Sequence, residues 1–209
     1  ERVGDRAHAL AALRGAVQID ASRADLRARL VSLLVANGDV AAAADLMARY
    51  GDSAPDDVAS ALLLARGYVQ DGRSEQAIAV LRERLARDPE CLERVMMLGW
   101  DLAQEWPEAA FPIVELSADA AVARQDWDGA AAALQEFVSR VPLHVPALLR
   151  LVELAVDGGL DATMYAAQAQ LADAYLETGR AQEARFIAED LVAHEPFDHA
   201  HIELSLIHI

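Results

Sequence analysis

Residues 58–89 read VASALLLARGYVQDGRSEQAIAVLRERLARDP, and this stretch decides the fold. Small and apolar residues recur at helical spacing on both sides of Gly72, which predicts two helices joined by a turn. Glycine suits such a turn because it adopts the left-handed conformation at a helix end. Pro89 ends the second helix. The residues that mark the pattern are Ala61, Leu64, Ala65 and Tyr68 in the first helix, and Ala77 and Leu81 in the second.

The same marks recur at a period of 34 residues. Gly72, Ala77, Leu81 and Pro89 are preceded at that distance by Gly38, Ala43, Met47 and Pro55, and at twice that distance by Gly4, Ala9, Leu13 and Ala21. A turn glycine, a small residue and a helix-ending proline that keep one register indicate an internal repeat.

This pattern resembles the tetratricopeptide repeat, a helix-turn-helix unit of 34 residues. The resemblance implies an all-α fold, a right-handed α-solenoid of antiparallel helix pairs in which each unit buries its apolar face against its neighbours. It also implies a non-catalytic scaffold that binds other proteins or peptides.

The repeat marks predict one array over residues 1–203. Its units are a partial one at 1–21, two regular ones at 24–57 and 58–91, an irregular stretch at 92–142, and a last unit at 143–196. The middle is irregular because Pro142 comes 53 residues after Pro89, and Pro196 comes 54 residues after Pro142. We expect three helices in each interval, at about 91–105, 112–124 and 128–140, then at 146–157, 161–178 and 181–194; two degenerate units with shortened helices are the alternative.

The two ends of the chain lead to further expectations. Glu1 falls inside a unit, so we expect the native N-terminus to be missing from this fragment. Residues 204–209 resemble a translated sequencing adapter, and we expect them to be a non-native tail. The absence of lysine and the abundance of alanine indicate a bacterial source. No signal-peptide pattern is present, which favours the cytoplasm.

Composition argues against several functions. The net charge of −16 argues against nucleic-acid binding, which needs clustered cations. No apolar run reaches the roughly 18 residues of a membrane span. All 18 cationic side chains are arginine, so the chain has no phosphate-loop or Schiff-base lysine. Cys91 is the only cysteine, which excludes an internal disulfide. We expect no cofactor and no metal.

Two short stretches suggest catalysis or metal binding without the context that either function needs. Gly51-Asp52-Ser53 resembles a hydrolase nucleophile motif, but no strand precedes it and the repeat register places it in a turn. A possible zinc cluster consists of His194, Glu195, Asp198, His199 and His201. The spacing of these histidines does not bring them together on one helix face, so we expect a hydrated turn instead.

Proteins of the resembled family bind partners on a concave face lined by the first helix of each unit. Transferred to this sequence, that face gives the candidate partner-binding residues Ser32, Val35, Leu62, Arg66, Val69, Gln70, Asp173, Leu176 and Glu177. A mostly apolar groove of this kind favours a peptide held by side-chain pockets. Two alternatives remain open: these residues contact only solvent and neighbouring helices, or the array is the regulatory or substrate-recruiting arm of an enzyme whose catalytic domain lies elsewhere.

Three large aromatic residues, Trp100, Trp106 and Trp127, fall in the irregular middle. Tryptophan is enriched at binding hot spots, and it also fills space where helices of unequal length meet. We favour the packing role.

Overall fold

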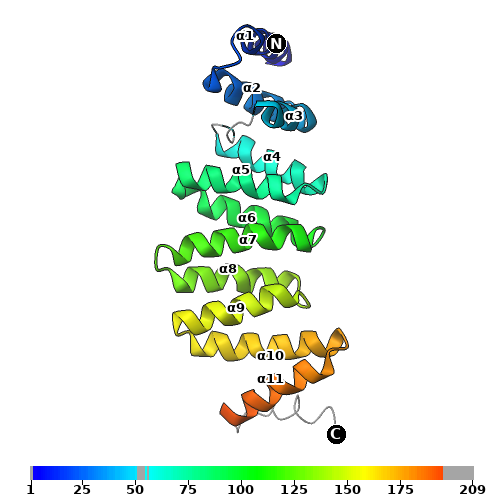
Figure 1. Cartoon of the computed structure of the whole chain (residues 1–209), viewed down its shortest axis with the longest axis vertical. Coiled ribbons are helices and arrows are strands. Elements are labelled where there is room, and N and C mark those ends of the chain that lie inside the picture. The colour runs from blue at the N-terminus through cyan, green and yellow to red at the C-terminus, as the bar shows by residue number, and fades with distance from the viewer. Residues whose placement is uncertain (1, 51–54, 56, 195–209) are drawn as a thin grey trace. The chain divides into compact units, whose positions relative to one another are not determined.

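The computed structural model describes residues 2–50, 55 and 57–194 of the chain (Figure 1). These residues form eleven α-helices and one short 3-10 helix, and no strand occurs among them. The helices group into two compact units, residues 1–98 and 99–209. The fold class is an all-α solenoid of helix pairs, as the repeat pattern predicts.

The first unit contains two regular helix pairs. Its helices are α1 (Arg2–Ile19), α2 (Ala24–Ala36), α3 (Val40–Tyr50), α4 (Val58–Gln70) and α5 (Ser74–Arg87), followed by a 3-10 helix over Pro89–Cys91. Helix α2 packs against α3, and α4 packs against α5. Gly38 and Gly72 join the two helices of each pair, with φ angles of +84° and +72°. Both turn glycines of the sequence pattern therefore have the left-handed conformation.

The second unit continues the succession of helices. Helix α6 (Leu92–Leu102) leads into it, and it then contains α7 (Pro107–Val122), α8 (Trp127–Arg140), α9 (Val145–Gly158), α10 (Asp161–Glu177) and α11 (Ala181–His194). Helices α6 to α8 lie between Pro89 and Pro142, and α9 to α11 follow Pro142. Each interval therefore holds three helices, which is the content of one unit and one additional helix.

The helices keep a regular spacing through the middle of the chain, whereas the turns between them are irregular there. The even-numbered helices α2 to α10 begin 34 or 35 residues apart, at Ala24, Val58, Leu92, Trp127 and Asp161. The proline marks suggested an irregular spacing because they occupy different places in the repeat. Pro89 precedes an even-numbered helix, α6, whereas Pro142 precedes an odd-numbered helix, α9. A proline disfavours helix in the residue before it whichever helix of a pair it follows, so it does not fix the boundary of a unit.

The left-handed turn residues do not keep the regular spacing of the helices. In the second unit they follow α7 (Gln125, φ +63°), α9 (Gly159, φ +66°) and α10 (Gly179, φ +78°). The connection from α6 to α7 instead ends at Trp106, directly before Pro107 begins α7, and has no residue with positive φ. After α6 the left-handed residue therefore follows odd-numbered helices instead of even-numbered ones, and it follows an even-numbered helix again at α10, which has such a residue before it and after it.

Small residues allow neighbouring helices to approach closely in both units. Ala43 and Ala77, two of the repeat marks, have no exposed area. In the second unit, a Cβ atom added to Gly99 on α6 would lie 2.6 Å from the Cγ2 atom of Val114 on α7. These residues leave no space for a larger side chain, which explains why the repeat pattern needs glycine or alanine there.

Gln125 offers a test of the turn assignment. A left-handed conformation strains a residue that has a Cβ atom, and glycine avoids that strain. We expect Gln125→Gly to raise the free energy of unfolding by up to about 1 kcal/mol. Urea denaturation followed by circular dichroism measures this change. The matched control Gln135→Gly, inside α8, should lower stability by about 1 kcal/mol. Equal destabilisation by both changes would contradict the turn assignment.

Candidate partner-binding site

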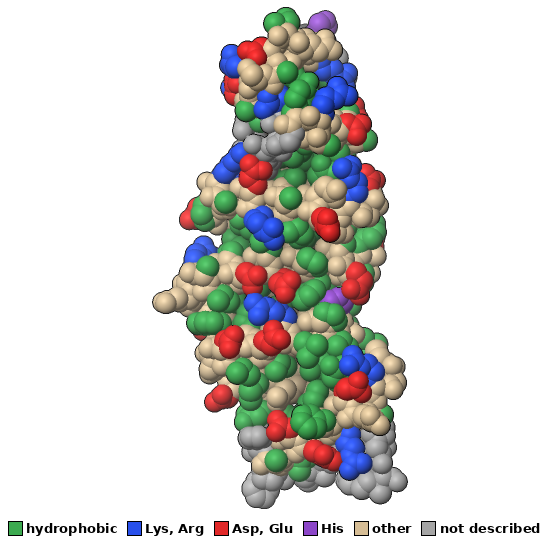
Figure 2. All heavy atoms as spheres, viewed as in Figure 1, with side chains coloured by type: hydrophobic (Ala, Val, Ile, Leu, Met, Phe, Trp, Pro, Cys, Tyr) green, Lys and Arg blue, Asp and Glu red, His purple; other side chains and the backbone are tan. Residues whose placement is uncertain are grey.

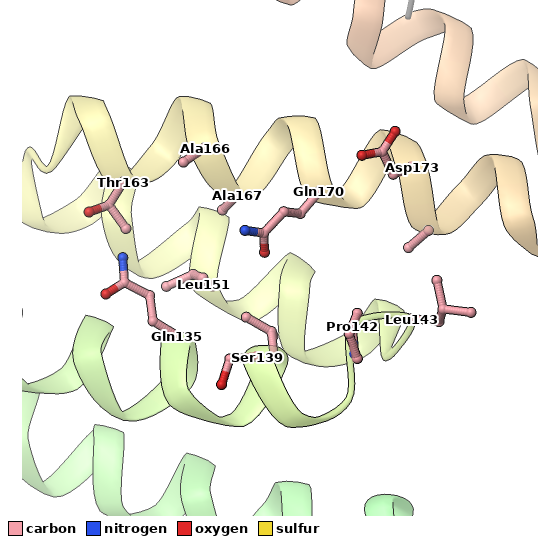
Figure 3. Close-up of a pocket in the computed structure, with 12 residues that line it drawn as sticks. Gln135, Ser139, Pro142, Leu143, Leu151, Thr163, Ala166, Ala167, Gln170 and Asp173 are labelled. Carbon is pink, nitrogen blue, oxygen red and sulfur yellow. The ribbon is translucent and has the colours of Figure 1, made fainter. Parts of the chain in front are cut away.

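A pocket of about 480 Å³ lies in the second unit between α8 and α10 (Figure 3). We call it the α8–α10 pocket. Its apolar lining consists of Val138 on α8, Pro142 and Leu143 in the turn after α8, Leu151 on α9, and Ala166, Ala167 and Ala174 on α10. Its polar lining consists of Gln135 and Ser139 on α8, and Thr163, Gln170 and Asp173 on α10. Three successive helices therefore build one site.

Alanines on α10 explain why the helices leave a space here. Ala166, Ala167 and Ala174 extend only one carbon atom from the backbone, so they do not fill the distance to α8. Leu151 on α9 is 2% exposed and belongs to the buried core behind the pocket. Leu143 is 50% exposed at its edge. The pocket thus has an apolar interior and an apolar edge that a partner can cover.

His144 fixes the turn that carries Pro142 and Leu143. It is the N-cap residue of α9, and its Nδ1 atom accepts a hydrogen bond of 3.1 Å from the Ala147 amide. The ring is buried, with centroids 5.0 Å from Phe111 and 5.2 Å from Phe137. The pocket edge is therefore anchored by a capped helix end and by an aromatic cluster rather than by a free loop.

A carboxylate lies near the other nitrogen of this ring. The Nε2 atom of His144 is 3.6 Å from an oxygen of Glu108 on α7, whose side chain is 85% exposed. Burial lowers the pKa of His144, and the Glu108 carboxylate partly opposes that shift. The Nδ1 atom must be unprotonated to accept its hydrogen bond, which agrees with a neutral ring.

Polar groups reach into the pocket from opposite sides. Figure 3 shows the amide side chains of Gln135 and Gln170 extending into the space between α8 and α10. Each amide can donate and accept hydrogen bonds, as a peptide backbone requires. Burial, together with the nearby charge of Glu177, raises the pKa of Asp173. The site can therefore bind an apolar side chain and hydrogen-bond the chain that carries it.

Among the nine predicted partner-binding residues, Asp173 is the one that lines this pocket. Leu176 is half-buried and Glu177 is exposed in the next turn of α10. In the first unit, Ser32, Leu62 and Arg66 are half-buried and Gln70 is exposed, on α2 and α4. Val35 and Val69 are 3% and 2% exposed, so they are core residues and we exclude them from the binding surface.

Gln135, Leu143 and Gln170 are pocket residues that the sequence analysis did not select. Helix α8 was not selected because it lies in the stretch where the proline marks lose the 34-residue period. The sequence did contain one signal for an exposed apolar side chain at this site. Leu143 directly follows Pro142, which ends a helix, and residues of such turns lie at the surface.

The tryptophans pack within the second unit. The indole N–H of Trp100 donates a hydrogen bond of 3.0 Å to the Ala133 carbonyl on α8. Trp127 lies against Gly158, where an added Cβ atom would come within 3.1 Å of it. Trp106 is half-buried at the start of α7. The contacts of Trp100 and Trp127 agree with the packing role.

The catalytic candidate and the metal-binding candidate of the sequence analysis both fall outside the described part of the chain. Gly51-Asp52-Ser53 and residues 195–209 lie outside the described residues, and so does the side chain of His194. Among the described side chains, which are those of residues 8–50, 55 and 57–193, no group of three or more His, Cys, Asp or Glu is placed to hold a metal ion. Cys91 is buried, and burial raises the pKa of its thiol. No described helix is both long and apolar enough to cross a membrane.

Comparison with known protein families identifies this helical-repeat protein. Two family models, each described as tetratricopeptide repeat, match residues 2–66 and 116–163, which together are more than half of the chain. The chain therefore belongs to the tetratricopeptide repeat family. The second match covers α8 and α9, so the middle stretch also contains this repeat.

Several solved structures resemble the chain. The C-terminal part of a TPR repeat-containing protein from Cytophaga hutchinsonii is 12% identical, with 97% of this chain and 95% of that chain covered and a TM-score of 0.36. A putative kinesin light chain with TPR-like repeats from Podosopora anserina is 22% identical, with 82% and 94% covered and a TM-score of 0.34. PilW, a type IV pilus biogenesis factor, is 16% identical, with 88% and 98% covered and a TM-score of 0.29. No curated protein matches the chain.

Proposed function

We propose that this protein is a non-catalytic scaffold that binds a segment of another protein or a peptide in the α8–α10 pocket. The observation that carries the proposal is an open pocket of about 480 Å³ with an apolar interior, bounded by residues of α8, α9 and α10. This volume lies within the range of small-ligand pockets and can hold one or two apolar side chains.

The two amides favour a peptide over a purely apolar ligand. Gln135 and Gln170 lie on opposite sides of the pocket, where they can hydrogen-bond the backbone of an extended segment. Ser139 and Thr163 add hydroxyl groups at the same walls. In the first unit, the accessible residues Ser32, Leu62, Arg66 and Gln70 are proposed as a second contact surface.

Blocking the pocket tests this function. A displayed library of random peptides is panned against the protein, and the affinities of the selected peptides are measured by fluorescence anisotropy. Ala166 is exposed in the pocket lining, so Ala166→Trp should fill the space and weaken these peptides at least about tenfold. The matched control Ala162→Trp, at an exposed position one turn earlier on α10, should leave their affinities unchanged. Selected peptides that bind both variants equally well would refute the pocket as the binding site.

A further inference from the structure

We propose that the α8–α10 pocket selects a segment in which an apolar side chain is followed closely by arginine or lysine, with the cation held by Asp173 and Glu177. The inference rests on the proposed function and specifies the chemistry of its partner.

The apolar part of the pocket fits a branched or aromatic side chain. Val138 and Leu151 provide apolar surface from α8 and α9, and Leu143 extends it to the edge. No charged residue other than Asp173 lines the pocket. A charged side chain placed among the apolar residues would lose its hydration, so the group that enters there is apolar.

The acidic part lies at one end of the same pocket. Asp173 lines the pocket, and Glu177 follows it four residues later, one helical turn along α10. Side chains at this spacing lie on the same helix face, and two like charges there repel each other. A cation between them removes the repulsion and gains attraction from both carboxylates.

In the part of the chain that the structure describes, the acidic pair has no arginine counterion, whereas several other acidic residues of this unit form ion pairs. Arg150 on α9 forms ion pairs with Glu115 and Asp119 of α7 and with Glu153, at 2.7 to 3.8 Å. Glu183 and Glu189 pair with arginines of the α10–α11 connection and of α11. Within the described residues, no arginine forms an ion pair with Asp173 or Glu177. Figure 2 shows one such arrangement near the middle of the drawn face, where blue side chains lie next to red ones.

Charge complementarity therefore selects the occupant. Burial and Glu177 together raise the pKa of Asp173, because both oppose the charge of its carboxylate, and a nearby cation would stabilise that charge. A bound cation reverses that shift, so affinity for a cationic segment should fall as acidic pH protonates Asp173 in the free protein. The overall charge of −16 also steers cationic segments toward the protein.

The test compares residue preferences on a positional-scanning peptide array. The wild-type protein should favour Leu, Ile or Phe at one position and Arg or Lys within two positions of it, with at least about tenfold weaker binding when glutamine replaces the cation. The double variant D173N/E177Q should lose the preference for a cation and keep the apolar preference. The control D71N/E75Q changes the same charge on exposed residues of the first unit and should keep both preferences.

The outcomes separate this inference from the proposed function. If Ala166→Trp abolishes array binding but D173N/E177Q still prefers a cation, the pocket binds peptides and the inference about its acidic edge is wrong. If Ala166→Trp has no effect on array binding, the proposed function fails. Sedimentation velocity tests whether a second copy of the protein fills the pocket instead. If the wild-type protein is a dimer and Ala166→Trp makes it a monomer, a second copy occupies the pocket and the inference is wrong.

Discussion

Phe137→Ala is expected to lower the free energy of unfolding by about 3 to 5 kcal/mol. The side chain of Phe137 has no exposed area, and its ring contacts Phe111 at a centroid distance of 5.8 Å and the ring of His144. Truncation to alanine removes these contacts and leaves a cavity that α8, held on both sides by neighbouring helices, cannot close. Because Phe137 supports the turn that carries Leu143, the same change should also weaken peptide binding to the α8–α10 pocket.

Phe186→Ala is the matched control for this prediction. Phe186 lies on α11 in the same unit and is 76% exposed, so the same substitution should change stability by less than about 0.5 kcal/mol. Both free energies come from chemical denaturation monitored by circular dichroism. A loss below 1 kcal/mol for Phe137→Ala would show that the aromatic cluster is not a packed core.

The helices could be predicted from sequence because their signals are local. Gly38 and Gly72 mark turns through a conformation that glycine adopts easily, and alanines at a fixed distance mark the helix crossings. The altered order of left-handed turns in the second unit was visible in the sequence only as an altered proline spacing. The turn at Gln125 could not be recognised from the sequence, since glutamine is not one of the residues that are typical of left-handed turns.

The pocket could be predicted only in part because it depends on distant residues. Asp173 was found from its position on the helix, whereas Gln135 lies 38 residues earlier on a helix that the repeat marks did not assign. Val35 and Val69 show the limit of transferring a family pattern. A small rotation of a helix about its axis moves such a residue from the surface into the core, and sequence spacing does not specify that rotation.

His144 was not selected from the sequence at all, although its buried position predicts that stability depends on pH. Its Nδ1 atom accepts the Ala147 amide hydrogen bond, so the folded state requires a neutral ring. Burial lowers its pKa from the ordinary value of 6.5, while Glu108 is the charged side chain that faces it and opposes the shift. Glu108 is largely exposed, so water screens its charge and the effect of burial is larger.

The sign of the effect follows from proton linkage. Above pH 6.5 the ring is neutral in both states, and its contribution to stability is complete. As the pH falls below 6.5, the unfolded chain binds a proton before the folded chain does, so stability decreases until the pH reaches the lowered pKa of the folded state. Protonation in the folded state also removes the acceptor that caps α9, since both ring nitrogens then carry hydrogen.

We therefore expect wild-type protein to lose stability relative to His144→Asn as the pH falls from 7.5 to 5. Asparagine keeps an oxygen acceptor at the N-cap but does not titrate, and His144→Ala, which removes the acceptor, should lower stability by about 0.5 to 2 kcal/mol at pH 7.5. Urea denaturation at each pH gives the difference between wild type and His144→Asn, in which the titration of the other residues cancels. A difference that stays constant, or that grows in favour of wild type as the pH falls, would mean that the His144 ring accepts a proton in the folded protein without losing its place in the helix cap.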